Sequence, residues 1–249
     1  NESALLAARK NKTKVFMIDF EEAKDKVMMG IERKSMILTP EDKKITAYHE
    51  AGHAIVAYYT KNADPVHKIT IVPRGRALGL TAQIPEVERY NYSIDYLLGR
   101  LDILMGGRCA EKIIFNNMTT GAGNDISVAT DISRKMVCEW GMSEKIGPMK
   151  LGNKEEEVFL GKEMNKNRDV SEQKSVVIDE EITNLVKNAE KNALNILNNN
   201  LKNLHDVSTV LLDKSTIGRT EFEDIIANGI IEKPKVEEKK RIRRKNKSV

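Results

Sequence analysis

Two histidines and one glutamate stand within a single pentapeptide, His49-Glu50-Ala51-Gly52-His53. On an α-helix, residues four apart lie one turn above each other, so both imidazoles can face one ion while Glu50 stands beside it. Zinc held by imidazoles lowers the pKa of a bound water from about 15.7 towards about 7, and an adjacent carboxylate can take the proton. His49 and His53 are therefore candidate zinc ligands and Glu50 is the candidate general base of a direct hydrolysis without a covalent intermediate.

The alternative is that these side chains only pack or face solvent. With 4 histidines in 249 residues, about 0.006 such pentapeptides are expected by chance, which disfavours coincidence.

A zinc site of this type needs a third protein ligand and leaves a fourth position for water. Val56 and Tyr59 occupy the positions where an extended form of the motif carries glycine and a third histidine, so the third ligand must lie elsewhere. His67, at the start of a predicted strand, and His205, at a polar helix junction, are candidates. Both fit ordinary surface or core roles better.

Acidic residues are the other candidates for the third ligand. Glu111 and Asp131 lie on predicted helices among many carboxylates, and nothing local distinguishes them. Asp125 follows the loop Gly121-Ala122-Gly123-Asn124 at a helix start, where a carboxylate could point inward. Local sequence alone favours a plain N-cap over a ligand at this position.

The pentapeptide falls inside a predicted helix. Thr39 is the expected N-cap, Pro40 fits the first turn, and the helix should continue to about Tyr59. Two short strands, Val66 to Pro73 and Leu80 to Ile84, should then form a hairpin or small sheet.

The fold class predicted from the whole pattern is mainly α, in keeping with 31% charged and only 5% aromatic residues. Asp19 is the expected cap of the second helix. Further helices are predicted from about Glu2 to Lys10, Phe20 to Glu32, Ser93 to Ile114, Asn124 to Trp140 and Ser175 to Leu201, with shorter ones near Asp206 and Thr220.

Charge and cysteine content exclude several classes of protein. The formal net charge of +4 comes from 41 basic and 37 acidic residues, which gives no reason to expect a nucleic-acid partner. Cys109 and Cys138 are too few for a disulfide framework or zinc ribbon, and both are expected to be buried thiols. No run of about 18 apolar residues and no signal peptide are present, so the chain as given is expected to be soluble.

The basic excess is concentrated near the C-terminus. Disorder is predicted beyond Pro234, and this tail is expected to be a solvated end, with contact to an anionic lipid surface as the alternative.

Several stretches of the chain, up to about residue 232, resemble the peptidase portion of the FtsH family of membrane-anchored AAA+ metalloproteases. They occur in the family's order, which is more specific than one pentapeptide. They are Lys24-Asp25-Lys26-Val27-Met28-Met29-Gly30, Thr46-Ala47-Tyr48 before the pentapeptide, Pro73-Arg74-Gly75-Arg76-Ala77-Leu78-Gly79, Gly106-Gly107-Arg108, Thr120-Gly121-Ala122-Gly123-Asn124-Asp125 and Trp140-Gly141-Met142-Ser143.

The resemblance implies a helical zinc-metallopeptidase with Zn²⁺ held by His49, His53 and Asp125, because Asp125 matches the aspartate of the family's Gly-Ala-x-Asn-Asp segment. Glu50 takes the family's catalytic position. The region from Gly75 to Ile84 resembles the strand against which the family lays an extended substrate, a mode with little sequence preference.

The resemblance also implies a domain organisation. Residues 1–38 resemble the last helices of an AAA+ ATPase lid, 39–232 the zinc peptidase domain, and 233–249 form the basic disordered tail. The chain has no phosphate-binding loop. ATP and Mg²⁺ would therefore act only through an ATPase domain missing from this chain.

For the intact protein, the family implies a homo-hexamer that degrades unfolded, damaged or membrane proteins in protein quality control. Membrane attachment would come through N-terminal segments missing from this chain, in a bacterial plasma membrane, the mitochondrial inner membrane or a plastid. Two competing hypotheses are a non-catalytic helical assembly module and a zinc hydrolase that acts on something other than peptides.

Overall fold

The computed structural model describes residues 1–33, 38–75, 77–151 and 171–230. The described part is mainly helical with one small antiparallel sheet, which confirms the predicted fold class. Its elements in order are α1 (Glu2–Arg9), α2 (Met17–Met29), α3 (Pro40–Tyr59), β1 (Val66–Thr70), β2 (Leu80–Gln83), α4 (Ile94–Phe115), the 3-10 turn η1 (Thr120–Ala122), α5 (Gly123–Cys138), α6 (Glu172–Asn199), α7 (Leu201–Lys214), β3 (Thr216–Gly218) and α8 (Arg219–Asn228).

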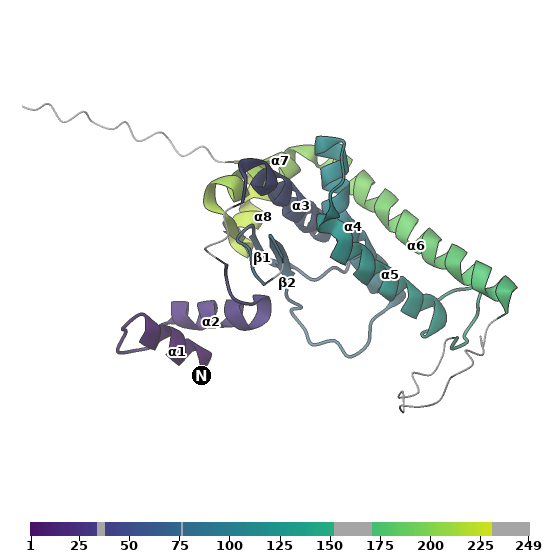
Figure 1. Ribbon diagram of the computed structural model, residues 1–249, viewed down its shortest axis with the longest axis horizontal. Coiled ribbons are helices and arrows are strands. Elements are labelled where there is room, and N and C mark those ends of the chain that lie inside the picture. Colours follow the sequence, from purple (N-terminus) through teal and green to yellow (C-terminus); the bar gives the residue numbers. More distant parts are fainter. Residues whose placement is uncertain (34–37, 76, 152–170, 231–249) are drawn as a thin grey trace, which may run out of the picture.

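Helix α3 occupies the centre of the molecule, with α4 packed against it and the sheet on another side (Figure 1). The hydroxyl of Thr39 accepts a hydrogen bond from the backbone N–H of Asp42 at 3.0 Å, so the helix begins as predicted. Every residue from Thr46 to Ala57 is buried. A helix that is buried all round lies in the core, and this stretch contains the pentapeptide.

Helices α3 and α4 cross at a pair of glycines. A Cβ atom added to Gly52 would lie 2.5 Å from the carbonyl oxygen of Gly106, and one added to Gly106 would lie 2.8 Å from the carbonyl oxygen of Gly52. Because real Cβ atoms do not approach backbone this closely, only glycine at both positions allows the two backbones to meet. The crossing brings the middle of α4 against the pentapeptide.

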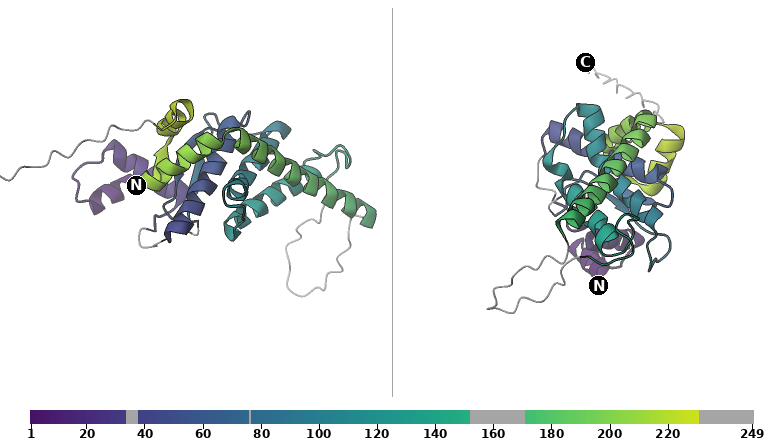
Figure 2. Two further views of the ribbon diagram at one scale, coloured as in Figure 1. Left: turned by 90° about the horizontal axis from the view of Figure 1, so that it is seen from above. Right: turned by 90° about the vertical axis from the view of Figure 1, so that its right-hand side faces the viewer.

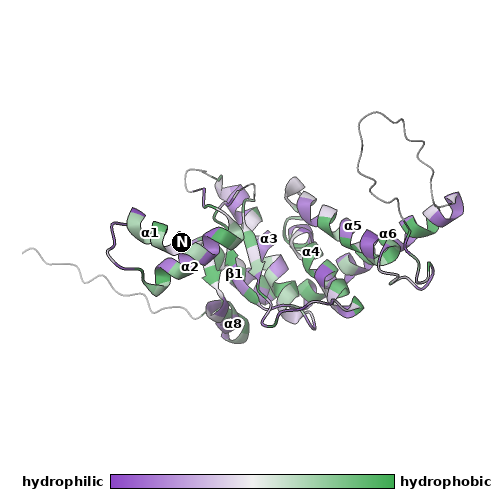
Figure 3. Cartoon of the chain, turned by 90° about the horizontal axis from the view of Figure 1, so that it is seen from below, coloured by the Kyte–Doolittle hydropathy of each residue, from purple (hydrophilic) through white to green (hydrophobic). Residues whose placement is uncertain are grey.

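The longest helix, α6, runs along α4 and α5, and α7 and α8 return past α3 to the sheet (Figures 1 and 2). The apolar residues of these helices share one core, and hydrophobic and hydrophilic residues alternate along each helix (Figure 3). The thiols of Cys109 and Cys138 are both buried and free, as expected.

The sheet has the strand order β2-β1-β3, with both pairs antiparallel. The hairpin of β1 and β2 was predicted, whereas β3 was not. Ile69 of β1 pairs with Thr81 of β2 on one side and with Ile217 of β3 on the other. Strand β2 is therefore an edge strand of the described sheet, and it lies next to α3.

The start of α2 corrects one prediction. Asp19 was expected to precede the helix as its N-cap, but the helix begins at Met17 and Asp19 lies in its first turn. The Asp19 carboxylate still satisfies a free amide, because it accepts from the backbone N–H of Phe16 at 3.0 Å.

Helices α1 and α2 pack on each other beside the rest of the molecule (Figure 1). The segment after α2 is joined to the loop that follows β1. The Arg74 guanidinium is buried and donates to the carbonyl oxygen of Gly30 at 3.1 Å and to the Glu32 carboxylate at 2.6 Å.

Residues 152–170 lie outside the described residues, as does the predicted tail beyond Pro234. Within the described ranges, none of the helices has the length and apolar character needed to cross a membrane.

Candidate metal centre

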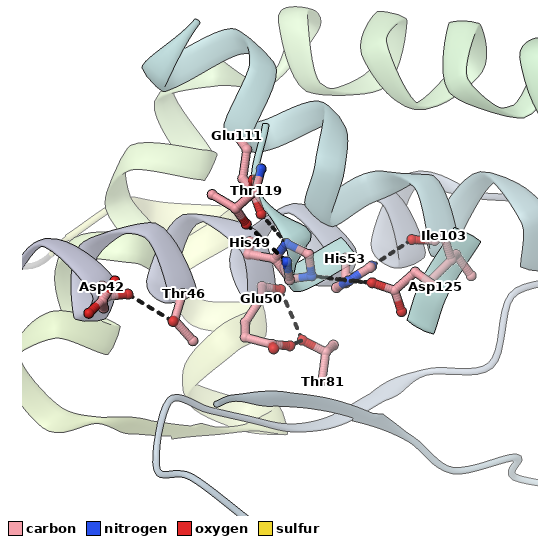
Figure 4. Close-up of polar contacts among 11 residues, drawn as sticks. Asp42, Thr46, His49, Glu50, His53, Thr81, Ile103, Glu111, Thr119 and Asp125 are labelled. Carbon is pink, nitrogen blue, oxygen red and sulfur yellow. Dashed lines mark hydrogen bonds and ion pairs between the residues drawn. The ribbon is translucent and has the colours of Figure 1, made fainter. Parts of the chain in front are cut away.

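Three side chains from two helices converge on one point. The Nε2 atoms of His49 and His53, on α3, lie 3.1 Å apart. An oxygen of Asp125, on α5, lies 3.3 Å from the first and 3.4 Å from the second (Figure 4). Donor atoms bound tetrahedrally to zinc at about 2.0–2.1 Å are about 3.3–3.4 Å apart. The three donor atoms therefore fit three corners of a tetrahedral zinc site.

The far side of each imidazole ring is hydrogen-bonded. His53 Nδ1 lies 2.7 Å from the carbonyl oxygen of Ile103, and His49 Nδ1 lies 2.7 Å from the Glu111 carboxylate (Figure 4). Because those oxygens accept, each Nδ1 carries a hydrogen, and each Nε2 is left either to share a proton with Asp125 or to present a lone pair to a cation. Two lone pairs 3.1 Å apart repel each other unless a cation or proton lies between them. This donor set fits a metal ion.

Asp125 reaches the histidines from the first turn of α5. The N-cap of this helix is Ala122, without a side-chain cap bond. The N-cap role that local sequence favoured for Asp125 is therefore wrong. Thr119 is the N-cap of the preceding 3-10 turn, and its hydroxyl accepts from the Gly121 N–H at 3.1 Å.

The protonation states of the two histidines and the nearby carboxylates depend on one another. Burial alone would lower the pKa of His49, but hydrogen bonds to Asp125 and Glu111 outweigh it and raise this pKa to about 10. Burial alone would raise the pKa of Asp125, but its hydrogen bonds to His49 and His53 hold that pKa well below its usual range. Three carboxylates, those of Asp125, Glu111 and Glu50, lie around the two rings, so the cluster attracts a cation.

Glu50 extends from α3 towards β2 (Figure 4). The Thr81 hydroxyl lies 2.7 Å from one Glu50 carboxylate oxygen, to which it donates, and 2.9 Å from the Glu50 carbonyl oxygen. A Cβ atom added to Gly79 would lie 2.7 Å from the other carboxylate oxygen. Burial raises the pKa of Glu50 above its ordinary value, although the two histidines and Thr81 oppose this shift.

Gly107 of α4 leaves room for the rings. A Cβ atom added there would lie 2.5 Å from His49 Nε2 and 2.6 Å from His53 Nε2. Any larger residue would displace both imidazoles.

The other candidates from the sequence lie outside this cluster. His67 lies in β1, half-buried, and His205 lies on α7 with its Nδ1 2.9 Å from the Tyr48 hydroxyl. Asp131 is exposed on α5. In the described part of the chain, the residues grouped closely enough to share a metal ion are His49, His53 and Asp125.

Glu111 is the residue that sequence reasoning passed over. It is only 1% exposed, and its second oxygen accepts from the backbone N–H of Thr119 at 2.7 Å. A signal was present, because Glu111 stands four residues after Gly107 and seven after Leu104. It therefore shares a helix face with residues in an otherwise apolar stretch.

The family "Peptidase family M41" matches residues 36–225. The chain is 54% identical over 226 residues to "ATP-dependent zinc metalloprotease FtsH" of Acidobacterium capsulatum, covering 91% of this chain and 35% of that protein. A protein of the same name from Caulobacter vibrioides is 50% identical over 240 residues, covering 96% of this chain and 38% of the relative.

A third FtsH, from Pelodictyon phaeoclathratiforme, is 46% identical over 229 residues, covering 92% of this chain and 35% of that protein. The chain thus spans about a third of the length of these relatives. The resemblance to the FtsH family expected from the sequence is confirmed, and the chain belongs to peptidase family M41.

Proposed function

We propose that this chain is the peptidase portion of an FtsH-type zinc metalloendopeptidase that hydrolyses peptide bonds of unfolded, damaged or membrane proteins. The observation that carries the proposal is the convergence of two imidazole nitrogens and one carboxylate oxygen at tetrahedral spacing, with Glu50 next in sequence to His49. The family match supports the peptidase chemistry.

His49, His53 and Asp125 would hold the zinc, which leaves a fourth position open. When bound, zinc polarises the substrate carbonyl and lowers the pKa of a water molecule towards about 7. Glu111 and the Ile103 carbonyl oxygen fix the two rings by accepting from their Nδ1 hydrogens.

Glu50 moves the proton. Its carboxylate takes a proton from the attacking water as the oxygen forms a bond to the carbonyl carbon. The same carboxyl then gives that proton to the amide nitrogen as the C–N bond breaks. The Thr81 hydroxyl holds one carboxylate oxygen at 2.7 Å and so orients the group.

Strand β2 supplies a backbone edge for the substrate. An extended polypeptide can add to an edge strand through main-chain hydrogen bonds, which requires an unfolded segment but little particular sequence. Thr81 and Gly79 lie against Glu50, so a chain paired with this edge runs past the catalytic carboxylate.

The organisation of the intact protein is part of the proposal. Residues 1–38 form the end of an AAA+ lid, 39–232 the peptidase domain and 233–249 a basic tail. An ATPase that binds ATP and Mg²⁺ delivers substrate, the protein is a homo-hexamer, and preceding segments attach it to a bacterial or organellar membrane. Sedimentation equilibrium on the intact protein tests the oligomeric state. We expect the mass of a hexamer, and the mass of a monomer at micromolar concentration would contradict this part of the proposal.

Zinc content and casein cleavage test the peptidase activity. Glu50→Gln should retain one zinc per chain and lose cleavage by at least 100-fold, because the proton acceptor is gone while the ligands remain. Glu41→Gln is the matched control, since Glu41 is exposed in the first turn of the same helix. It should cleave like the unmodified chain.

Equal cleavage by Glu50→Gln and the unmodified chain would contradict the mechanism. Stoichiometric zinc with no cleavage by either protein would favour a hydrolase of another substrate. Absence of both zinc and cleavage would favour a non-catalytic assembly module.

A further inference from the structure

A pocket of about 510 Å³ lies at the far end of β2. It is bordered by Gln83 and Pro85, at the end of the strand, by the loop that leads to α4, and by the first turns of α4, where Tyr96 and Arg100 lie. None of its lining residues belongs to the candidate metal centre.

The pocket is close to the reaction site along the strand. Side chains two residues apart in a strand lie on the same face and are about 7 Å apart. Gln83 therefore lies on the same face of β2 as Thr81, whose hydroxyl contacts Glu50. A polypeptide paired with β2 would bring one of its own alternating side chains over the pocket.

The charged groups of the pocket other than Glu88 are held by contacts within the pocket wall. Asp64, which is buried, accepts from the Tyr96 hydroxyl at 2.7 Å and pairs with Arg89 at 3.4 Å. Arg100 donates to the Gln83 side chain at 2.6 Å, and Gln83 donates to the Asp64 carbonyl oxygen at 2.7 Å. An entering side chain therefore meets two arginines that are already engaged and the exposed, negatively charged Glu88, which accepts from the Tyr90 hydroxyl at 3.1 Å.

Two tyrosine rings form part of the uncharged lining of the pocket. The rings of Tyr92 and Tyr96 are stacked with centroids 5.1 Å apart, and the Arg89 guanidinium lies 4.9 Å from the centre of the Tyr96 ring. Burial and the hydrogen bond to Asp64 raise the pKa of Tyr96 to about 12, so its hydroxyl stays a donor and the ring stays in position. Tyr92 remains 52% exposed and offers its ring to a ligand.

We propose that this pocket is a subsite for an aromatic side chain of the bound polypeptide, two to three residues from the peptide bond that is cut. The inference rests on the proposed function and adds a side-chain preference to binding through the backbone. Flat rings stack on Tyr92 and against Pro85, whereas an aspartate loses hydration, faces Glu88 and finds both lining arginines already engaged.

Peptide binding and cleavage together test this subsite. A set of otherwise identical peptides carries one phenylalanine, moved from four residues before to four residues after a single cleaved bond. Affinity for the zinc-loaded Glu50→Gln chain is measured by calorimetry, and kcat/KM is measured with the active chain. At one position two to three residues from the bond, phenylalanine should improve both quantities about tenfold over alanine.

Three variants assign that preference to the pocket. Tyr92→Ala should abolish the preference for phenylalanine. Tyr92→Phe keeps the ring and should keep the preference. Val87→Ala is the control for the loop, because Val87 is 70% exposed outside the pocket and should have no effect.

The outcomes separate the two proposals. Zinc-dependent cleavage that requires Glu50 but is indifferent to phenylalanine at every position overturns the subsite alone. A preference that survives Tyr92→Ala also overturns it. If the chain neither binds nor cuts any peptide, the proposed function fails and the subsite fails with it.

Discussion

Each imidazole of the candidate metal centre is held at both ring nitrogens. On one side Nε2 faces the shared metal position, and on the other Nδ1 donates to a buried oxygen, from Glu111 for His49 and from Ile103 for His53. Such outer partners fix the tautomer and direction of the ring. Metal affinity should therefore depend on residues that never touch the ion.

Glu111→Gln tests this dependence. The glutamine has one fewer acceptor oxygen for His49 and Thr119 and removes a negative charge, so zinc affinity should fall about 10- to 100-fold. Competition with a chromophoric chelator measures the affinity, and circular dichroism should show unchanged helical content. Glu139→Gln, an exposed change at the end of α5, is the control and should bind zinc normally. Unaltered affinity in Glu111→Gln would contradict the positioning role.

The three residues of the pentapeptide could be singled out from sequence because their spacing matches one helical turn. Asp125 could not, since a carboxylate at a helix start equally fits an N-cap, and only the family motif distinguished it. Glu111 was considered as a ligand, but its contact with His49 was missed for a different reason. Its partner stands 62 residues earlier, and the two meet only because α3 and α4 cross closely.

At the scale of the elements, the close crossing of α3 and α4 depends on glycines. Gly106→Ala would insert a Cβ atom 2.8 Å from the Gly52 carbonyl oxygen, so the helices must move apart. We expect a loss of about 1–3 kcal/mol in the free energy of unfolding, measured by urea denaturation with chelator present. Gly123→Ala is the matched control, because no atom lies within 4 Å of its added Cβ. Similar stability of both variants would argue against a tight crossing.

The packing of α4 on α6 makes a pH-dependent contribution to the stability of the fold. Burial raises the pKa of Asp102 from 3.8 to about 6, although a hydrogen bond from Asn192 opposes this. The folded state thus holds the proton more tightly than the unfolded chain. Protonated Asp102 therefore contributes to the free energy of unfolding, and this contribution is lost as the pH rises through about 6.

Asp102→Asn should therefore stabilise the chain at pH 7 by about 1 kcal/mol, less than the full pKa difference implies because the carboxyl is partly solvated. At about pH 4 the difference should be several-fold smaller, because Asp102 is then largely neutral in the folded state and only partly ionised in the unfolded chain. Urea unfolding at the two pH values, with chelator present, measures this. Asp131→Asn, on the exposed face of α5, should have no such effect. Equal stabilisation by Asp102→Asn at both pH values would refute the linkage.

Helix positions followed from local sequence wherever a cap was clear. Thr39 and Ser93 both accept from backbone amides of the first turn, at 3.0 Å and 3.2 Å, and α3 and α4 begin as predicted. Strand β3 was missed because three residues carry no usable pattern, and it exists through pairing with β1, almost 150 residues earlier. Pairing over that distance depends on tertiary packing.

At the scale of the whole molecule, the candidate metal position lies between elements far apart in the sequence. It links α3 to α5, and α4 lies against both. An ion bound only by the folded state stabilises it by about 2.7 kcal/mol when free zinc is 100 times the dissociation constant. Metal binding should therefore be visible in global stability.

Chelation of zinc should lower the Tm by about 5–10 °C for a chain of this size. Differential scanning calorimetry with and without chelator measures the shift. Asp125→Asn should have a low Tm that chelator barely changes, whereas Asp131→Asn should behave like the unmodified chain. A Tm in the unmodified chain that does not respond to chelator would contradict a link between metal and fold.

The most direct test of the metal centre is anomalous diffraction at the zinc absorption edge from crystals of the zinc-loaded chain. The account predicts one strong peak about 2.0–2.2 Å from the Nε2 atoms of His49 and His53 and from a carboxylate oxygen of Asp125. A peak bound by other residues, or zinc-saturated crystals without density between these three side chains, would contradict it.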